Sequence, residues 1–180
     1  EWVKEKVFEI NDVFFEAYKR IYDIIKLPGG SSCFGHFNIW GPGKTVKVQC
    51  DASAMFSTKM FAEFVAPALE EQCDWLDNSL YHLDGSQEIP HLDVLLSISS
   101  LDAIQWTPEP SVPKTGDKHW YDMYNRILKA GKGVQINSLL KGQVLPLLDN
   151  IGTKGVFISI DDVNSQKEAD YLLKEIEKRK

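Results

Sequence analysis

His82 and Asp84 are two polar residues in a short apolar segment. An imidazole and a carboxylate at this spacing suit proton transfer or ligand binding. They lie between Leu80 and Gly85. Residues two apart in an extended segment point to the same side, so both side chains can reach one ligand. A neighbouring carboxylate raises the pKa of an imidazole and fixes its tautomer. His82 and Asp84 are therefore candidate catalytic residues. A structural His-Asp hydrogen bond beside a turn at Gly85 is the alternative.

Four further candidates stand at the ends of other apolar or β-branched segments. They are Asp51, Gln105, Trp106 and Asn137. In parallel α/β folds, ligands bind at the carboxyl ends of the strands. Strand ends are also polar simply because loops begin there, which is the alternative explanation. The pattern predicts that these four residues bind a substrate near His82 and Asp84, with Trp106 as a wall of the pocket.

The elements that must position these residues are strands that alternate with helices. Apolar residues recur at three- and four-residue steps from residue 2 to 26, which is typical of one face of a helix; they are Val3, Val7, Ile10, Phe14, Tyr18, Ile21 and Ile25. Five strand-then-helix units follow, and this alternation predicts parallel βαβ crossovers. The expected strands cover residues 45–50, 80–83, 101–106, 134–137 and 155–160, and the expected helices cover residues 57–78, 90–98, 117–130, 143–150 and 165–180.

Helix boundaries can be assigned from single residues. Ser57, Asp117 and Ser165 are expected to cap three helices, and Glu168 completes a capping box with Ser165. Pro67 is expected to kink or restart the helix that contains it. The loop from residue 33 to 44 is rich in glycine and aromatic residues and has no predicted strand.

The strand and helix pattern fits a doubly wound sheet or a barrel. No Gly-x-Gly-x-x-Gly follows any strand, so a dinucleotide fold has no positive signal. A complete eight-unit barrel takes about 250 residues, and this chain has 180 residues. We therefore expect residues 1–180 to be a single partial domain, the C-terminal part of a barrel whose N-terminal part is absent.

Composition narrows the class of protein. The chain is 43% hydrophobic and 26% charged, with a net charge of -6 and a pI near 5.2. An acidic chain argues against nucleic acid as the main partner, and no apolar run approaches the roughly 20 residues of a membrane span. Cys33, Cys50 and Cys73 are an odd number without regular spacing, which predicts a reducing, cytoplasmic setting and no disulfide framework.

Several blocks of sequence occur in an order that is known from one superfamily. They are Trp40–Lys44, Val48–Asp51, Ser57 with Phe61, Phe64, Val65 and Pro67, Tyr81–Gly85, His91–Asp93 with Leu95 and Leu96, Leu101–Trp106 and Ala130–Lys132. In this order they resemble uroporphyrinogen decarboxylase-like proteins and corrinoid methyltransferases, and they are most similar to the branch labelled trimethylamine corrinoid proteins. The resemblance covers nearly the whole chain. It implies the C-terminal half of a (β/α)8 TIM barrel with its active site at the carboxyl ends of the strands.

The resemblance also implies an activity, which is methyl transfer involving the cobalamin of a corrinoid protein. His82 or Asp84 would then orient or deprotonate the methyl acceptor. Decarboxylation of a tetrapyrrole and non-catalytic binding of a tetrapyrrole or corrinoid stay open as alternatives. Only Lys44, Lys114 and Lys141 lie close to predicted strand-end loops, and a substrate with many carboxylates needs more cations.

Zinc-dependent members of the superfamily carry a His-x-Cys pair and a distant C-terminal cysteine. The corresponding pair here is His82 and Asp84, and no cysteine follows Cys73. We therefore expect no family-type zinc site and no tightly bound cofactor; an atypical site of Cys50, His82 and Asp84 is the alternative. A partial barrel also exposes sheet edges, which predicts a homodimer or another association through them.

Overall fold

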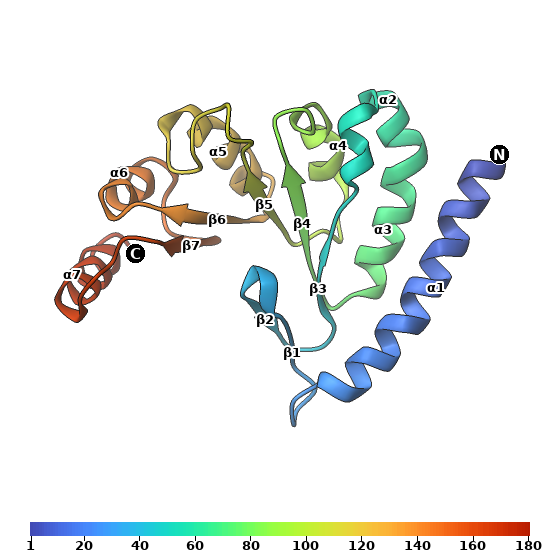
Figure 1. The fold of residues 1–180 in the computed structure, drawn as a ribbon, viewed down its shortest axis with the longest axis horizontal. Helices are drawn as coiled ribbons and strands as arrows, with labels where there is room; N and C mark the ends of the chain where they lie inside the picture. Colours follow the sequence, from blue (N-terminus) through green and yellow to red (C-terminus); the bar gives the residue numbers. More distant parts are fainter. The chain divides into compact units, whose positions relative to one another are not determined.

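The computed structural model describes residues 1–180 and shows an α/β protein with helices beside parallel strands (Figure 1). The chain divides into two compact units. Unit 1 comprises residues Glu1–His82 and Gln87–Asp102, and unit 2 comprises residues Leu83–Ser86 and Ala103–Lys180. Strand β4 contributes residues to both units, and each unit is described by itself below.

The predicted parallel strands are confirmed. β3 pairs in parallel with β4, β5 pairs in parallel with β6, and β6 pairs in parallel with β7. The strands follow one another in the order β3-β4-β5-β6-β7. Their bounds are Thr45–Val48 for β3, Asn78–Asp84 for β4, Ala103–Thr107 for β5, Gly133–Leu139 for β6 and Val156–Ile160 for β7. Local periodicity was sufficient to find all five, because each strand carries a short apolar or β-branched run between turn residues.

Unit 1 contains a hairpin that the sequence pattern did not predict. β1 and β2 pair antiparallel around a 3-10 turn, within the segment expected to be a loop. The helices of this unit are the predicted ones, with one irregularity: a π turn connects α2 to α3. The bounds are Trp2–Ile25 for α1, Ser32–Phe34 for β1, Gly35–Phe37 for the 3-10 turn, Ile39–Gly41 for β2, Asp51–Met55 for a 3-10 segment, Thr58–Met60 for α2, Phe61–Val65 for the π turn, Ala66–Trp75 for α3, Ile89–His91 for a further 3-10 turn and Leu92–Ser97 for α4.

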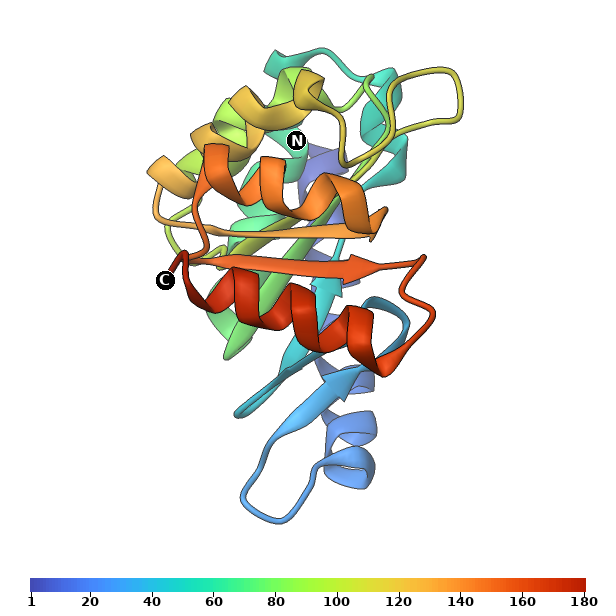
Figure 2. The same ribbon diagram turned by 90° about the vertical axis from the view of Figure 1, so that its left-hand side faces the viewer.

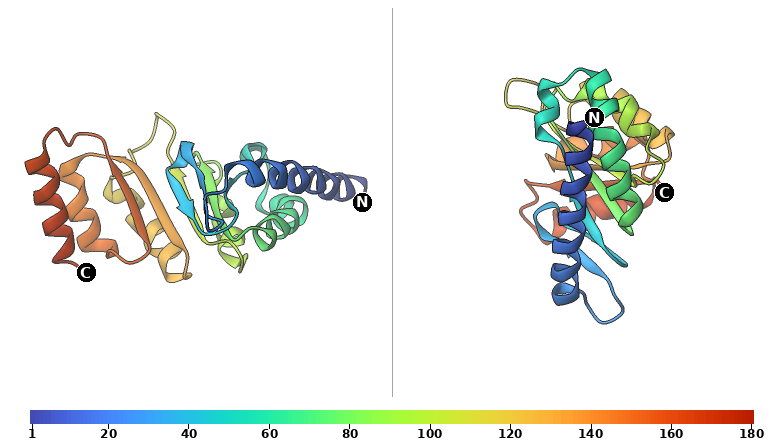
Figure 3. Two further views of the ribbon diagram at one scale, coloured as in Figure 1. Left: turned by 90° about the horizontal axis from the view of Figure 1, so that it is seen from below. Right: turned by 90° about the vertical axis from the view of Figure 1, so that its right-hand side faces the viewer.

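Helix α1 packs along α3 (Figure 3) with a face that includes part of the predicted apolar stripe. Asn11 is buried, and its amide donates to the Ala68 carbonyl at 2.8 Å. Tyr18 is buried as well and donates to the Thr45 carbonyl at 3.2 Å. Ile10 and Ile21, which the sequence pattern placed on the same stripe as Tyr18, are exposed. No helix is both long enough and apolar enough to span a lipid bilayer.

Unit 2 has three helices that run alongside its strands (Figure 2). Helices α6 and α7 lie on one side of β6 and β7 (Figure 3). A core of fully buried apolar side chains lies between the strands and the helices, because alternate strand residues point to the helix layer. The bounds are Lys118–Trp120 for a 3-10 turn, Tyr121–Lys129 for α5, Lys141–Ile151 for α6 and Gln166–Glu177 for α7, and the core includes Ile104, Trp106, Tyr124, Ile127, Ile136, Leu139, Val144 and Leu147.

The three predicted caps are confirmed. Ser57 accepts from the Met60 N–H at 3.2 Å, Asp117 accepts from the His119 N–H at 2.8 Å, and Ser165 accepts from the Glu168 N–H at 3.3 Å. The expected capping box is only half formed, because the Glu168 carboxylate accepts from the N–H of Asn164 instead of Ser165. Pro67 is the second residue of α3, directly after the π turn, so regular α-helical geometry restarts beside it as expected.

Candidate functional site

A cavity of about 310 Å³ lies at the carboxyl ends of β5, β6 and β7 in unit 2. Its lining combines buried polar groups at the strand ends with charged groups from the loops that follow. The lining residues are Gln105, Trp106, Thr107, Pro108, Lys114, Thr115, Asn137, Ser138, Leu140 and Asp161. Three of the four predicted substrate-binding residues, Gln105, Trp106 and Asn137, therefore border one cavity.

An irregularity in β6 shapes this cavity. The pairing of β6 with β7 changes register between Ile136 and Leu139, which brackets the two cavity residues Asn137 and Ser138. Ser138 has a φ of 60°, in the left-handed region that non-glycine residues rarely adopt. A bulge of this kind turns side chains away from the regular alternation of a strand, and bulges occur often beside active sites.

Asn137 is held in a fixed orientation. Its Oδ1 accepts from the Gln135 Nε2 and from the Ser159 Oγ, both at 3.3 Å. Its carbonyl accepts from the Thr115 hydroxyl at 2.7 Å. With both oxygens engaged, the Nδ2 amide is the group that remains to donate to a ligand. Asn137 is the best oriented hydrogen-bond donor of the cavity.

Gln105 and Trp106 both line the cavity, and as adjacent residues of β5 their side chains point to opposite faces of the strand. The Gln105 Nε2 donates to the Trp106 carbonyl at 2.7 Å and to the Thr107 hydroxyl at 2.8 Å, so this amide braces the strand end. The Trp106 ring is completely buried and packs 4.8 Å from the Trp120 ring. Its indole face is thus part of the core and is not open for stacking on a flat ligand.

The lining of the cavity contains a single cationic side chain, that of Lys114. Lys114 is exposed at the rim, as is Asp161. Lys44, in unit 1, lies 4.4 Å above the Trp75 ring and 3.7 Å from the Asp77 carboxylate. These contacts engage the Lys44 ammonium within its own unit, so only Lys114 is placed to meet an anionic ligand in this cavity.

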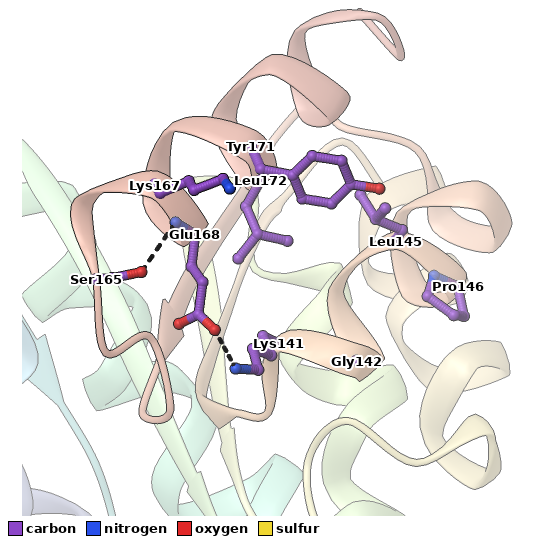
Figure 4. A pocket seen from close by; sticks show the side chains of 9 residues that line it. All are labelled: Lys141, Gly142, Leu145, Pro146, Ser165, Lys167, Glu168, Tyr171 and Leu172. Atoms are coloured by element: carbon purple, nitrogen blue, oxygen red, sulfur yellow. Dashed lines mark hydrogen bonds and ion pairs between the residues drawn. The ribbon is translucent and has the colours of Figure 1, made fainter.

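Lys141 belongs to a different groove of unit 2, of about 710 Å³, between α6 and α7 (Figure 4). Its ammonium lies 2.6 Å from the Glu168 carboxylate. The Asp162 carboxylate accepts from the Lys141 N–H at 2.5 Å. Carboxylates thus already engage the Lys141 ammonium and the amino end of α6 in this groove.

The remaining predicted residues lie at or beyond the ends of β3 and β4. Asp51 is exposed and accepts from the Gln49 Nε2 at 2.8 Å. His82 is half-buried, and its ring makes an edge contact with Phe37 at 5.0 Å. The hairpin that carries Phe37 therefore covers one side of the imidazole. Asp84 is exposed at the carboxyl end of β4, and it belongs to unit 2.

The turn after Asp84 is anchored by Glu109, a residue that the sequence pattern did not single out. Its carboxylate accepts from the Ser86 N–H at 2.9 Å and from the Ser86 hydroxyl at 2.5 Å. These hydrogen bonds, the hydroxyl first, hold the pKa of the Glu109 carboxyl below its ordinary range. The two residues are 23 positions apart, so no local motif could have paired them.

A second group that the sequence pattern missed is a buried polar cluster in unit 1. The Ser53 hydroxyl donates to the Glu88 carboxylate at 2.8 Å, and the His91 Nε2 donates to the Ser53 carbonyl at 2.9 Å. The His91 ring stacks on Phe61 at 4.4 Å. Because Ser53, Glu88 and His91 are all buried, this cluster fixes the segment after β3 to the segment before α4 and presents no group to a ligand.

Metal ligation finds little support in the donor set. Burial raises the pKa of the Cys50 thiol, which disfavours the thiolate that binds zinc. Asp84 stands where a cysteine would complete a His-x-Cys pair, and no group of three or more histidine, cysteine or acidic side chains is placed to hold a metal ion. The residues present therefore do not fit a zinc site with thiolate ligands.

No protein-family model matches the chain, and a search of the curated proteins gives no match. The chemistry of the cavity consequently has to be argued from its own groups. It offers the Asn137 amide and the Ser138 hydroxyl at the strand end, and the Lys114 ammonium and the Asp161 carboxylate at the rim. A few convergent polar groups in a concave site are what the binding of a small polar molecule requires.

Proposed function

We propose that the chain is the C-terminal half of a (β/α)8 barrel and that the cavity at β5–β7 binds the methyl acceptor of a corrinoid-linked methyltransferase. The observation that carries the binding site is its place at the carboxyl ends of three consecutive parallel strands, where barrels of this kind hold their active sites. The methyl-transfer chemistry is inferred from the resemblance to uroporphyrinogen decarboxylase-like methyltransferases.

The dimensions of the cavity favour a small acceptor. A volume of about 310 Å³ is near the lower limit of the roughly 300–1,000 Å³ typical of ligand pockets. A tetrapyrrole ring with many carboxylates would also need several cations, and Lys114 is the only cationic residue among those that line the cavity. These properties suit an arrangement in which the corrin ring stays on a partner protein and only the acceptor enters the cavity, and they argue against uroporphyrinogen decarboxylation.

The residues of this chain would perform two tasks. A corrinoid partner would supply the methyl group as an electrophile and would keep the electron pair of the broken cobalt–carbon bond. A thiol acceptor would form the new carbon–sulfur bond and would have to lose its proton. Asn137 and Lys114 would hold the acceptor through its polar groups. Asp84, at the carboxyl end of β4 and in the same unit as the cavity, is the candidate for receiving the proton.

The test is a methyl-transfer assay on the whole chain, with free methylcobalamin as the donor and homocysteine as the thiol. The spectrum of methylcobalamin should disappear faster with the protein than without it. Asn137→Ala removes the oriented donor and should lower the rate about two- to tenfold, because a neutral hydrogen bond is worth roughly 0.5–1.5 kcal/mol. Asp84→Asn should lower the rate while leaving the thermal midpoint nearly unchanged.

The matched control for the cavity is Asn125→Ala. The Asn125 amide lies on α5 and bonds to Asn150, away from the cavity residues, so this variant should react like the wild type. Equal rates for Asn137→Ala and Asn125→Ala would contradict the assignment of the cavity. Binding of the corrinoid without turnover of any thiol would instead favour the non-catalytic binding protein.

A further inference from the structure

The cavity at the carboxyl ends of β5, β6 and β7 holds two opposite charges that no other side chain neutralises. Lys114 and Asp161 both line the cavity, and both are exposed at its rim. Neither side chain makes a hydrogen bond or an ion pair with another residue. The other residues of the lining carry no formal charge. The rim therefore offers one ammonium and one carboxylate, and each lacks a counter-charge.

Hydrogen bonds to β6 hold the two charged residues on opposite sides of the carboxyl end of that strand. Lys114 lies in the loop after β5, directly before Thr115, whose hydroxyl donates to the Asn137 carbonyl at 2.7 Å. Asp161 lies directly after β7, and its N–H donates to the Leu139 carbonyl at 2.9 Å. Strand β6, which supplies both carbonyls, lies between β5 and β7 in the sheet. The two charged side chains thus reach the cavity from loops on opposite sides of β6.

The spacing of these loops matches the length of a small ligand. β5 and β7 are second neighbours in the sheet and lie roughly 10 Å apart, because adjacent strands are about 4.8 Å apart. In an α-amino acid a single carbon atom separates the ammonium from the carboxylate. With a charge-assisted hydrogen bond of about 2.8 Å at each end, such a molecule spans a comparable distance. One small zwitterion can therefore reach Lys114 with its carboxylate and Asp161 with its ammonium.

Uncharged donors of the cavity suit the carboxylate end of such a ligand. The Asn137 Nδ2 has no acceptor within the chain, because the hydrogen bonds of this side chain run to its Oδ1. The Thr107 hydroxyl accepts from the Gln105 Nε2 at 2.8 Å, which leaves its own proton to donate. Both Asn137 and Thr107 line the cavity. The cavity thus has donors for both oxygens of a carboxylate in addition to the Lys114 ammonium.

A ligand with a single charge fits this lining less well. A carboxylate without an ammonium would be attracted by Lys114 and repelled by Asp161, and an amine without a carboxylate would be attracted and repelled in the opposite sense. A zwitterion satisfies both groups and has no net charge, as the lining has none. Because both groups are exposed to water, each ion pair contributes modestly, and selectivity comes from the requirement for both.

We propose that the cavity at β5–β7 binds a small α-amino acid as a zwitterion, with its carboxylate at Lys114 and Asn137 and its ammonium at Asp161. This inference rests on the proposed function in taking the cavity as the acceptor site, and it names the chemical class of the acceptor, a thiol that carries both an ammonium and a carboxylate. Recognition of the two charges involves no methyl transfer, so binding can be measured separately from turnover.

The experiment is isothermal titration calorimetry on the whole chain with three thiols that differ in their charged groups. Homocysteine carries both charges, 4-mercaptobutanoate lacks the ammonium, and 3-aminopropanethiol lacks the carboxylate. Homocysteine should bind about threefold to tenfold more tightly than either of the other two thiols, because it makes one further charge-assisted contact at the rim and avoids the repulsion that a single charge meets.

Substitutions at the two charged residues should give a crossed pattern of affinities. Lys114→Met should weaken the binding of homocysteine and 4-mercaptobutanoate about threefold to tenfold without weakening that of 3-aminopropanethiol. Asp161→Asn should weaken the binding of homocysteine and 3-aminopropanethiol without weakening that of 4-mercaptobutanoate. The matched controls are Lys118→Met and Asp122→Asn, which make the same changes in charge at exposed positions outside the cavity lining. Both controls should bind all three thiols like the wild type.

Three results would overturn the inference: equal affinities of the wild type for the three thiols, no binding of any of them, or an equal loss of all three affinities in a folded Lys114→Met or Asp161→Asn variant. The thermal midpoint by circular dichroism shows whether each variant is folded. Homocysteine that binds with the crossed pattern but does not demethylate methylcobalamin would support the zwitterion site and contradict the methyl transfer. Demethylation with all three thiols at the same rate, together with equal affinities, would support the methyl transfer and contradict the zwitterion site.

Discussion

At the scale of single residues, Glu109 links two loops that follow neighbouring segments of unit 2. Its carboxylate holds the Ser86 N–H and hydroxyl, while the Gly85 N–H donates to the Thr107 carbonyl at 2.9 Å. Gly85 has a φ of 83°, which a glycine adopts without strain. The turn after Asp84 thus depends on an ionised carboxylate, and its stability should depend on pH.

The sign of this dependence follows from the lowered pKa of Glu109. Its stabilising contribution is complete above the ordinary glutamate pKa and is lost as the pH falls through the lower pKa of the folded protein. Glu109→Gln should therefore unfold at a lower temperature than the wild type at pH 7, and the difference should vanish between about pH 5 and pH 3. Differential scanning calorimetry over this range measures it.

The control for Glu109 is Glu70→Gln, an exposed residue of α3 without a hydrogen bond or ion pair. The unfolding temperature of Glu70→Gln should stay close to that of the wild type at each pH. A Glu109→Gln difference that is the same at pH 3 and pH 7 would show that the side chain acts through packing and not through its charge.

The candidate site shows which features of a binding site can be predicted from residue types and their spacing. Gln105 and Asn137 could be placed at one edge from the sequence, since the carboxyl ends of parallel strands share an edge. The core position of Trp106 could also have been foreseen from strict strand alternation with Gln105. The orientation of Asn137 could not, because it depends on the bulge at Ser138 and on Ser159, which lies on another strand.

At the scale of elements, the boundaries of helices were predictable where a single residue type determines them. Gly131 follows α5 with a φ of 81° and has open space where a Cβ would lie. Gly142 lies in the first turn of α6 with ordinary helical geometry and equally open space. Both glycines have room for a Cβ and differ in backbone conformation, which makes them a useful pair to compare.

Replacing each glycine by alanine should have opposite effects on the free energy of unfolding. Gly131→Ala forces a Cβ into the left-handed region and should destabilise the protein by about 1 kcal/mol. Gly142→Ala should stabilise it by about 0.5 kcal/mol, because alanine restricts the unfolded chain and favours the helix. Urea unfolding monitored by circular dichroism measures both. A loss of stability in both variants would mean that space, and not φ, decides the outcome.

The face of α1 shows where element prediction fails. Val3, Ile10 and Ile21 fit the three- and four-residue pattern as well as the buried Tyr18 does. Asn11 is buried instead, because it satisfies its amide with the Ala68 carbonyl and with Glu71. Periodicity therefore identified the helix but could not tell the face that packs on α3 from the face that is left exposed.

At the scale of the whole molecule, strand β4 is the element that both compact units require. Tyr81 belongs to unit 1 and Leu83 belongs to unit 2, and both side chains are completely buried. The parallel order of the strands was predictable from the alternation of strands and helices. The division of β4 between two units was not, because it arises from long-range packing that no local pattern encodes.

Because β4 cannot leave one core and remain in the other, the two units should unfold together. Ile136→Ala empties part of the core of unit 2, where Ile136 is completely buried, and should destabilise the protein by about 2–5 kcal/mol. Hydrogen exchange should then show the same loss of protection in α3 of unit 1 as in α6 of unit 2. Leu173→Ala, at an exposed leucine of α7, is the control and should leave the protection of α3 and of α6 unchanged. Loss of protection in α6 with α3 unaffected would show that each unit unfolds by itself and that β4 frays between them.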